Sequence, residues 1–434
     1  MSIDPDSEEL SLRERVSENP GPAMKWFAGA LLLFALEAGA VVNFVTGLFG
    51  PGVELPTLLS RDVISNLGYQ NPDTGVWQGT FMGLSPAYAW ALRVLLIYTY
   101  AAVCAWWLWR GYLVFREHYR YADWTPRDDM IDRLRGHRWG QFGAVIVFAF
   151  VVMALFAPAL GPTTVERTIS NPYSYHVEFY NESGQLDNVT VGQANLGARS
   201  QGTPDQNVGP MEYDEFGRFH PFGTMPTGKD MFTFMAAGAR ISLFIGLVSI
   251  GVSGLIAVAF ALLTAYYKGL IDLAVVIAGD SIMSLPRLLF VMLLTVVLGN
   301  HWIGEIYSGG FLLALIFAAT GWPFLWRAVR GPAMQVAEQE WIDAAKSFGQ
   351  RPSVTMRKHM APYILGYLLV YASMSLGGII IAVAHISFIP GVMIVLVVTA
   401  FNALGDGIRD AIDPQSETGE GEGAEVAAAG GGGA

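Results

Sequence analysis

The sequence is poor in charged residues, which make up 15% of its 434 residues, whereas 53% are hydrophobic. Soluble domains carry roughly 25% charged residues, so this composition indicates a membrane protein. Lysine is especially scarce, with 5 lysines beside 21 arginines, and the formal net charge is −11. Nucleic-acid binding needs basic patches to contact the phosphates, so the acidic excess argues against a nucleic-acid partner.

Cysteine is almost absent. Cys104 stands alone within an apolar run, so the chain has neither an intrachain disulfide nor a CxxC motif. A basic segment ahead of the first apolar run is also missing, because the start of the chain is acidic. This absence argues against a cleaved secretory signal.

Long apolar runs dominate the rest of the chain and predict eight helices, since about 20 apolar residues cross the hydrocarbon core. The last block, 364–404, is too long for one span, and we expect it to break at Ile389-Pro390-Gly391 with a short second helix. The other six predicted spans are Trp26–Leu48, Ala87–Leu108, Trp139–Leu160, 241–267, 272–299 and 309–328.

The distribution of arginine predicts the orientation. The loop 110–138 holds seven arginines, so the positive-inside rule makes it cytoplasmic. Eight spans then place both termini inside and the segment 161–239 outside. The basic loop 327–362 falls inside as well. Within the outer segment, alternating residues 175–180, a turn at 181–184 and the run 188–191 predict a β-hairpin.

A short charged insert, Gln339–Gly349, lies between two of the apolar runs. It reads Asp343-Ala344-Ala345-Lys346-x-x-Gly349, which predicts a helix followed by a sharp turn on one membrane face. Gly349 permits this turn because glycine adopts a left-handed backbone at little cost. Such an insert is poorly suited to lipid, so we expect it to contact a soluble partner.

The insert resembles the EAA loop of ABC importer permeases, with Asp343 where glutamate is usual and Ala361 where leucine is usual. The resemblance extends over roughly residues 127–413 and is to the second permease subunit of dipeptide, oligopeptide and nickel importers. The segments that carry it are His220–Thr224, Gly228–Asp230, Gly238–Leu243, Asp280-Ser281-x-x-Ser284-x-Pro286, Arg327-x-x-Arg330 and Gly405–Pro414.

The chain departs from that family in three places. Met225 and Lys229 replace a usual aspartate and arginine. Residues 24–113 add a helix pair to the usual six helices. The outer segment that the family places between its last two helices is replaced by the short stretch His385–Pro390. This last departure leaves open a rebuilt gate or a degenerate permease.

The resemblance implies an all-α membrane protein. Its type I ABC importer permease core would carry an extra N-terminal transmembrane hairpin and a small extracellular β-containing loop domain. The resemblance implies a non-enzymatic transporter subunit that is embedded in the lipid of the cell membrane. Its partners would be cytoplasmic ATPase subunits, a sister permease and an extracellular solute-binding protein. No cofactor or metal is expected in this chain, since ATP and Mg²⁺ would bind the partner subunits. The residues expected to couple to the ATPase are Asp343, Ala344, Ala345, Lys346 and Gly349.

A translocation pathway is expected at Asp280, Ser284 and Pro286. Pro286 removes a backbone hydrogen bond and kinks its helix, and an aspartate one to two turns earlier can face a polar pathway. A capping or packing role for Asp280 is equally open. Glu37 and Arg93 are expected to form a structural ion pair within the extra hairpin, because unpaired charge is costly inside a membrane.

Two other patterns carry no chemistry. The stretch Gly223–Asp230 resembles a phosphate-binding loop but contains Pro226 and lacks the final Ser or Thr that holds magnesium. Of the histidines, only His385 lies in a predicted span, which argues against a haem held by two histidines. The ATP-driving motifs are thus absent from the chain and must come from another subunit.

These observations predict the following organisation. Residues 1–23 form a disordered cytoplasmic N-terminus, 24–113 the extra hairpin, 114–138 a basic cytoplasmic linker and 139–160 the first core helix. The remaining parts are the extracellular loop domain 161–239, the permease core 240–405 with its coupling loop 327–362, and the acidic disordered tail 406–434.

Two alternative functions remain at this stage. One is a proton-coupled secondary transporter that uses Glu37 and Asp280 as proton sites. The other is a membrane scaffold that binds an ATPase without transporting. The substrate also stays open: peptides are implied by the resemblance, with nickel or oligosaccharides as alternatives.

Overall fold

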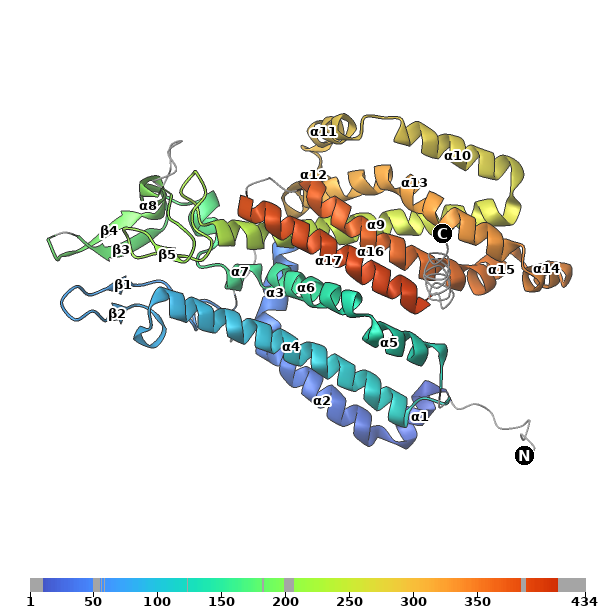
Figure 1. Cartoon of the computed structure of the whole chain (residues 1–434), viewed down its shortest axis with the longest axis horizontal. Coiled ribbons are helices and arrows are strands. Elements are labelled where there is room, and N and C mark those ends of the chain that lie inside the picture. The colour runs from blue at the N-terminus through green and yellow to red at the C-terminus, as the bar shows by residue number, and fades with distance from the viewer. Residues whose placement is uncertain are drawn as a thin grey trace, which may run out of the picture. The chain divides into compact units, whose positions relative to one another are not determined.

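The computed structural model describes residues 11–49, 55, 57, 59–122, 124–181, 183–198, 207–383 and 388–412 (Figure 1). Its contacts divide the chain into two compact units. The first comprises residues 1–125 and 155–237, and the second comprises residues 126–154 and 238–434. Each unit is described by itself below.

The first unit begins with four helices: α1 (Leu12–Glu18), α2 (Pro20–Leu36), α3 (Ala38–Phe49) and α4 (Pro86–His118). Helix α2 runs beside α4 (Figure 1), and two tryptophans join them. Trp26 Nε1 donates to the carbonyl of Trp107 at 3.0 Å, and Trp107 Nε1 donates to the carbonyl of Trp26 at 3.1 Å. Each ring covers a glycine on the opposite helix, Trp107 over Gly29 and Trp26 over Gly111, so a methyl group added at either glycine would overlap a ring.

The rest of the first unit consists of short elements around three two-stranded antiparallel sheets. The predicted hairpin is present, with Tyr180 opposite Leu186 and His176 opposite Thr190. The strands are β1 (Tyr69–Gln70), β2 (Trp77–Gln78), β3 (His176–Tyr180), β4 (Leu186–Thr190), β5 (Glu212–Tyr213) and β6 (Phe219–His220). The short helices are η1 (Phe81–Gly83), α7 (Ala157–Leu160), η2 (Glu166–Ser170) and α8 (Val191–Gly197).

All regular elements among the described residues of the second unit are helices. Its main core lies where α13 meets α16, with Trp322, Trp326, Val329 and Ile364 buried together. Its helices are α5 (Pro126–Gly136), α6 (Arg138–Leu155), α9 (Met231–Tyr267, whose first turns belong to the first unit), α10 (Gly269–Met283), α11 (Arg287–Leu298), α12 (Trp302–Glu305), η4 (Ile306–Gly309), α13 (Gly310–Ala337), α14 (Glu340–Ser347), α15 (Pro352–Thr355), η5 (Met356–Met360), α16 (Ala361–Val383) and α17 (Phe388–Ile412).

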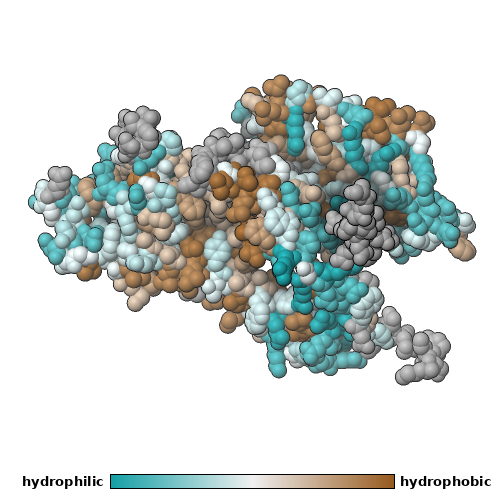
Figure 2. Space-filling view, in the orientation of Figure 1, coloured by the Kyte–Doolittle hydropathy of each residue, from teal (hydrophilic) through white to brown (hydrophobic). Residues whose placement is uncertain are grey.

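Among the described residues, 6 helices are long and apolar enough to cross a membrane, and the bent pair α10 and α11 makes a seventh span if counted once. On the face seen in Figure 2, hydrophobic residues cover much of α10 and α11, whereas hydrophilic residues cover the strands of the hairpin. Leu288 and Val296 on α11 are 73% and 78% exposed, as expected of side chains that face lipid. The mostly helical membrane fold predicted from composition is therefore correct.

Two predicted spans are not continuous helices. The first is interrupted at Glu37, between α2 and α3, where the buried carboxylate accepts a hydrogen bond from the Leu59 amide at 3.1 Å. The fifth bends by 83° between α10 and α11, at the predicted kink of Pro286. The strict count of spans is thus six or seven, with α2 as a shorter apolar helix, instead of eight.

The predicted disordered termini are partly helical. Residues 12–18 form α1, because Ser11 and Glu14 make a capping box in which Ser11 N donates to Glu14 Oε2 at 2.7 Å. At the other end, α17 continues to Ile412 and buries Ala411, so the segment 406–412 is not disordered. Residues 1–10 and 413–434 lie outside the described residues.

Several predicted boundaries also move. The linker 114–138 is largely helical, since α4 runs to His118 and α5 fills residues 126–136. Helix α9 begins at Met231 because Asp230 caps it, accepting from Thr233 N at 2.7 Å. The last helix is not short: α17 has 25 residues, with Pro390 in its first turn, where a missing N–H costs nothing. The predicted connection through His385 lies outside the described residues.

Candidate functional site

The charged insert forms helix α14, whose C-terminal end has a Schellman motif. Gly349 N donates to Lys346 O at 2.9 Å, and Gln350 N donates to Ala345 O at 3.1 Å. Gly349 has a φ of 72°, so the predicted left-handed turn is present. Glu340 and Asp343 lie in the first turn and Lys346 in the last, which complements the helix dipole.

One residue anchors α14 to the rest of the second unit. Ile342 is fully buried in the cluster that contains Trp326 of α13 and Ile364 of α16. Burial of an isoleucine side chain contributes roughly 1.5–3 kcal/mol, which is a strong hold for a helix of 8 residues. Lys346 adds a contact, with its Nζ 5.3 Å from the ring centre of Tyr266 and 3.4 Å from Asp343 Oδ1.

The opposite face of α14 is open. Asp343, Ala344 and Gly349 are exposed, and Phe348 is 90% exposed. An added Cβ at Gly349 would meet nothing within 4 Å. A helix that is anchored on one side and presents an aromatic ring, small residues and a carboxylate on the other is suited to dock onto another protein.

Two ion pairs connect α10 with α13. Arg330 donates through Nε to Asp272 Oδ1 at 2.8 Å and forms a second bond to Oδ2, so this pair is bidentate. Arg327 is paired with Asp280. The two arginines are three residues apart on α13 and therefore share one face. Asp272 is not among the pathway residues expected from the sequence; the spacing of the two arginines against the two aspartates was the signal that could have revealed its role.

The predicted pathway residues come together at the bend between α10 and α11. Ser284 N donates to Asp280 O at 2.9 Å, and Ser284 Oγ donates to Ser281 O at 2.7 Å. Pro286 immediately precedes α11. Its missing N–H costs no hydrogen bond there, because the first N–H groups of a helix have no partner within the helix. The Asp280 carboxylate thus meets the Arg327 guanidinium beside a break in the helix.

The pathway residues and the α14 residues are attached to the same helix, α13, but no hydrogen bond or ion pair joins the two sets within the described residues. Asp280 reaches α13 through Arg327. Helix α14 follows α13 in the chain after Glu338 and Gln339 and also packs on it through Ile342. Helix α13 is therefore the physical connection between them.

In the first unit, Glu37 and Arg93 do not form the expected ion pair. Arg93 is fully buried and donates instead to three carbonyls, Ile64 O at 2.6 Å, Ala159 O at 2.7 Å and Gly161 O at 3.0 Å. Two of these acceptors lie at the C-terminal end of α7, where helix carbonyls attract cations. Arg93 is thus a structural cap, and the prediction of an Arg93–Glu37 pair is wrong.

The stretch that resembles a phosphate-binding loop is a closed turn. Thr224 pairs with Asp230 across it, and Met225 N donates to Lys229 O at 2.8 Å. The amides of Met225 and Gly228 are therefore engaged within the turn, and that of Thr224 donates to Val208 O. Among the described residues, no group of three or more histidine, cysteine or acidic side chains could hold a metal ion.

Two known families match the chain. Residues 257–417 match the family described as "Binding-protein-dependent transport system inner membrane component". Residues 125–181 match "N-terminal TM domain of oligopeptide transport permease C". The first match contains α14, both ion pairs and the bend at Pro286. Residues 1–124 lie outside both matches.

Individual relatives agree with this assignment. The dipeptide transport system permease protein DppC of Bacillus subtilis is 27% identical over 342 residues, which cover 70% of this chain and 92% of that protein. The oligopeptide transport system permease protein OppC of the same organism is 26% identical and covers 66% of this chain and 89% of its own length. The glutathione transport system permease protein GsiD of Escherichia coli is 26% identical over a stretch that covers 67% of this chain and 91% of that protein.

The matched families are inner-membrane transport subunits and not enzymes. Their description implies an ATPase and a binding protein as partners. The chain belongs to the family of binding-protein-dependent transport permeases and is a multi-pass membrane subunit of an ABC importer.

Proposed function

We propose that this chain is the permease subunit of an ATP-driven importer of dipeptides or oligopeptides. The peptide substrate is supported by the names of its relatives, two of which transport dipeptides and oligopeptides. In this proposal a sister permease completes the pathway, and an extracellular solute-binding protein delivers the substrate. With α2 and α3 counted together as an eighth span, both termini lie in the cytoplasm. The chain itself needs no cofactor, since ATP and Mg²⁺ bind the ATPase subunits.

The observation that carries the coupling mechanism is the open face of α14. Asp343, Ala344, Ala345, Lys346 and Gly349 form the helix and its turn, and Phe348 beside them is 90% exposed. When a cytoplasmic ATPase binds this face and moves it, the buried contact of Ile342 transmits the movement to α13. Movement of α13 shifts Arg327 and Arg330 relative to their partners on α10, which gives a mechanical route to the pathway residues Asp280, Ser284 and Pro286.

The test is co-purification of ATPase subunits with the full chain in detergent. Gly349→Arg places a bulky charge on the docking face without touching the buried helices, and we expect ATPase to be lost. Phe348→Ala removes the exposed ring and is expected to weaken binding about tenfold. Gly184→Arg is the matched control, because Gly184 is also exposed, has open space around it and, like Gly349, has a positive φ. Equal ATPase retention by wild type and Gly349→Arg would exclude α14 as the coupling surface.

A transport assay separates this proposal from proton-coupled transport. Uptake driven by ATP stops when ATP is depleted and persists when a protonophore removes the proton gradient. Asp280 is already paired with Arg327, which argues against its use as a proton carrier. Uptake that is sensitive to the protonophore alone would favour the secondary transporter, and ATPase binding without any uptake would favour a scaffold.

A further inference from the structure

The first unit contains a small cavity of about 270 Å³, and none of its lining residues belongs to a helix that could span the membrane. It lies between the loop residues around Tyr69, the turn at Thr163, helix η2 and strands β3 and β6. Pockets for drug-sized ligands usually measure roughly 300–1,000 Å³. A cavity just below that range suits a molecule the size of an amino acid or a dipeptide.

Most of the charged groups around this cavity neutralise one another. His220 lies between Asp230 and Asp214, with Nδ1 2.9 Å from Asp230 Oδ2 and Nε2 3.4 Å from Asp214 Oδ2. Arg218 Nε donates to Asp214 Oδ2 at 2.6 Å, and its Nη1 donates to Asn195 Oδ1 at 2.8 Å. This buried network forms one wall, and only Arg218 Nη2 has no partner within the described residues.

Two lining charges remain outside that network. Arg167 of η2 donates to the carbonyl of His176 at 3.3 Å and lies 5.2 Å from the ring centre of Tyr175. Glu178 comes from β3 and is exposed. In the described part of the chain, no ion pair involves either side chain. A guanidinium and a carboxylate that line one cavity without neutralising each other are available to a ligand.

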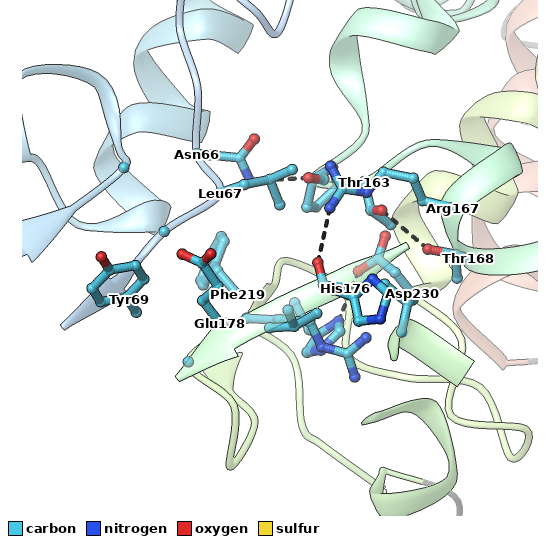
Figure 3. A pocket seen from close by; sticks show the side chains of 18 of the residues that line it. Asn66, Leu67, Tyr69, Thr163, Arg167, Thr168, His176, Glu178, Phe219 and Asp230 are labelled. Atoms are coloured by element: carbon cyan, nitrogen blue, oxygen red, sulfur yellow. Dashed lines mark hydrogen bonds and ion pairs between the residues drawn. The ribbon is translucent and has the colours of Figure 1, made fainter. Parts of the chain in front are cut away.

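Figure 3 shows how these groups lie. Arg167 is beside Thr163 and Thr168, whose hydroxyl groups are joined by a hydrogen bond of 3.1 Å. Glu178 is on the other side, beside Tyr69 and Phe219. The cavity therefore offers a cationic end with hydroxyl groups and an anionic end with aromatic rings.

We infer that this cavity binds a small zwitterion, an amino acid or a short peptide with free termini. Arg167 holds the ligand's carboxylate and Glu178 holds its ammonium group. The aromatic rings pack against the apolar part between them. This is a ligand site on the permease chain itself, outside its spans, and it depends neither on ATPase coupling nor on the identity of the transported substrate.

The test is a calorimetric titration of the full chain in detergent, with no ATPase present. The probes are glycine, diglycine and triglycine, together with diglycine that is acetylated at its amino end or amidated at its carboxyl end. We expect one of the three free zwitterions to bind, and either blocked form of diglycine to bind at least tenfold more weakly than diglycine. The best of the three lengths reports the spacing between Arg167 and Glu178.

Variants then show which side chain binds each end of the ligand. Arg167→Gln should weaken binding of the zwitterion at least tenfold while changing binding of the amidated form little. Glu178→Gln should weaken binding of the zwitterion at least tenfold while changing binding of the acetylated form little. Glu166→Gln is the matched control, because Glu166 neighbours Arg167 in η2 but does not line the cavity, and it should bind like wild type. Thermal unfolding of each variant checks that it is folded.

Two results would overturn the inference. One is that none of the free zwitterions binds to a folded wild-type chain at millimolar concentration. The other is binding of acetylated diglycine as strong as that of diglycine and unchanged by Glu178→Gln, which would describe a simple anion site. Gly349→Arg should keep the zwitterion while losing the ATPase, so a failure of this site and a failure of the proposed coupling are separable.

Discussion

Two arginines of the first unit and two of the second are satisfied in opposite ways. In the first unit, Arg93 is fully buried and donates to three backbone carbonyls. Arg61 likewise donates to Pro158 O at 2.9 Å and to the carbonyls of Gly161 and Thr163. In the second unit, Arg327 and Arg330 meet carboxylates on another helix, and Arg327 is half exposed.

The difference separates rigid parts from movable ones. Carbonyls belong to the backbone, so a guanidinium that caps three of them fixes the path of the chain and cannot leave without exposing all three. A carboxylate is carried by a side chain, and a half-exposed ion pair has a small net stability. Arg93 therefore holds the fold around α7, whereas the pairs between α10 and α13 can exchange at modest cost.

Replacing Arg93 by methionine should have the largest effect. The change keeps an unbranched apolar side chain but leaves the carbonyls of Ile64 and Ala159 without this donor, each costing roughly 1–3 kcal/mol, while Gly161 O keeps its bond from Arg61. We expect a loss of about 3 kcal/mol or more, seen as a lower yield of folded protein and a lower thermal midpoint in detergent. Arg110→Met on the same helix is the control, since Arg110 is exposed. A variant as stable as this control would refute the capping role.

Removing His220 tests a third arrangement, a buried cation held by two carboxylates. Burial alone would lower the pKa of His220, but its hydrogen bonds to Asp214 and Asp230 and their charges raise it above its ordinary value of 6.5. The stabilisation is thus complete below about pH 6.5 and is lost as pH rises through the raised pKa. Asp214 contributes in the opposite sense: burial favours a higher pKa, yet His220 and Arg218 lower it, so its contribution is lost only in acid.

His220→Asn should therefore cost roughly 2 kcal/mol below pH 6.5 and progressively less at higher pH. Hydrogen exchange of peptides from residues 208–232, followed between pH 6 and 9, measures this region directly. His118→Asn is the control because His118 lies at the end of α4. An equal loss of protection at all pH values would show that His220 acts through packing and not through its charge.

The ion pairs between α10 and α13 can be tested by charge reversal. Asp272→Arg and Arg330→Asp should each lower the thermal midpoint and transport, and the double variant should recover part of both. We expect a coupling of about 1.5 kcal/mol, because this pair is bidentate and partly buried. The same charge reversal at Asp280 and Arg327 should give a smaller coupling energy, since both side chains are about half exposed. Additive effects at both pairs would mean that neither ion pair stabilises the fold.

The turn after α14 is expected to give the smallest effect. Its carbonyls are satisfied by the amides of Gly349 and Gln350, with Gly349 in a left-handed conformation. Gly349→Ala should cost about 1 kcal/mol locally, measured as faster hydrogen exchange at residues 340–350. Gly331→Ala within α13 should be neutral or slightly stabilising, because Gly331 is helical and has open space around it. Similar behaviour of the two variants would argue against the strained turn.

Much of the helical framework could be predicted because hydrophobic runs and proline act locally. The 83° bend lies at the predicted kink of Pro286, and the turn at Gly349 has the predicted conformation. The β-hairpin also follows from local alternation. These features depend on neighbouring residues, so one stretch of sequence contains the information.

The partners of charged groups could not be predicted in the same way. Arg93 was expected to meet Glu37, the one acidic residue in the two predicted spans of the extra hairpin, but carbonyls of α7 and Ile64 satisfy it instead. Backbone carbonyls have no signature in a sequence. Capping similarly decided the ends of helices, since Asp230 starts α9 ten residues earlier than hydropathy suggested and Ser11 starts α1 in a polar segment.

The contact between α2 and α4 has a consequence for how relatives of this chain vary. Trp107 fills the space left by Gly29, and Trp26 fills the space left by Gly111. Neither member of a pair tolerates change alone, because a larger residue at the glycine overlaps the ring and a smaller residue at the tryptophan leaves a void. Among homologues that keep this helix pair, we expect the two positions of each pair to covary, with bulk at one compensated by its loss at the other.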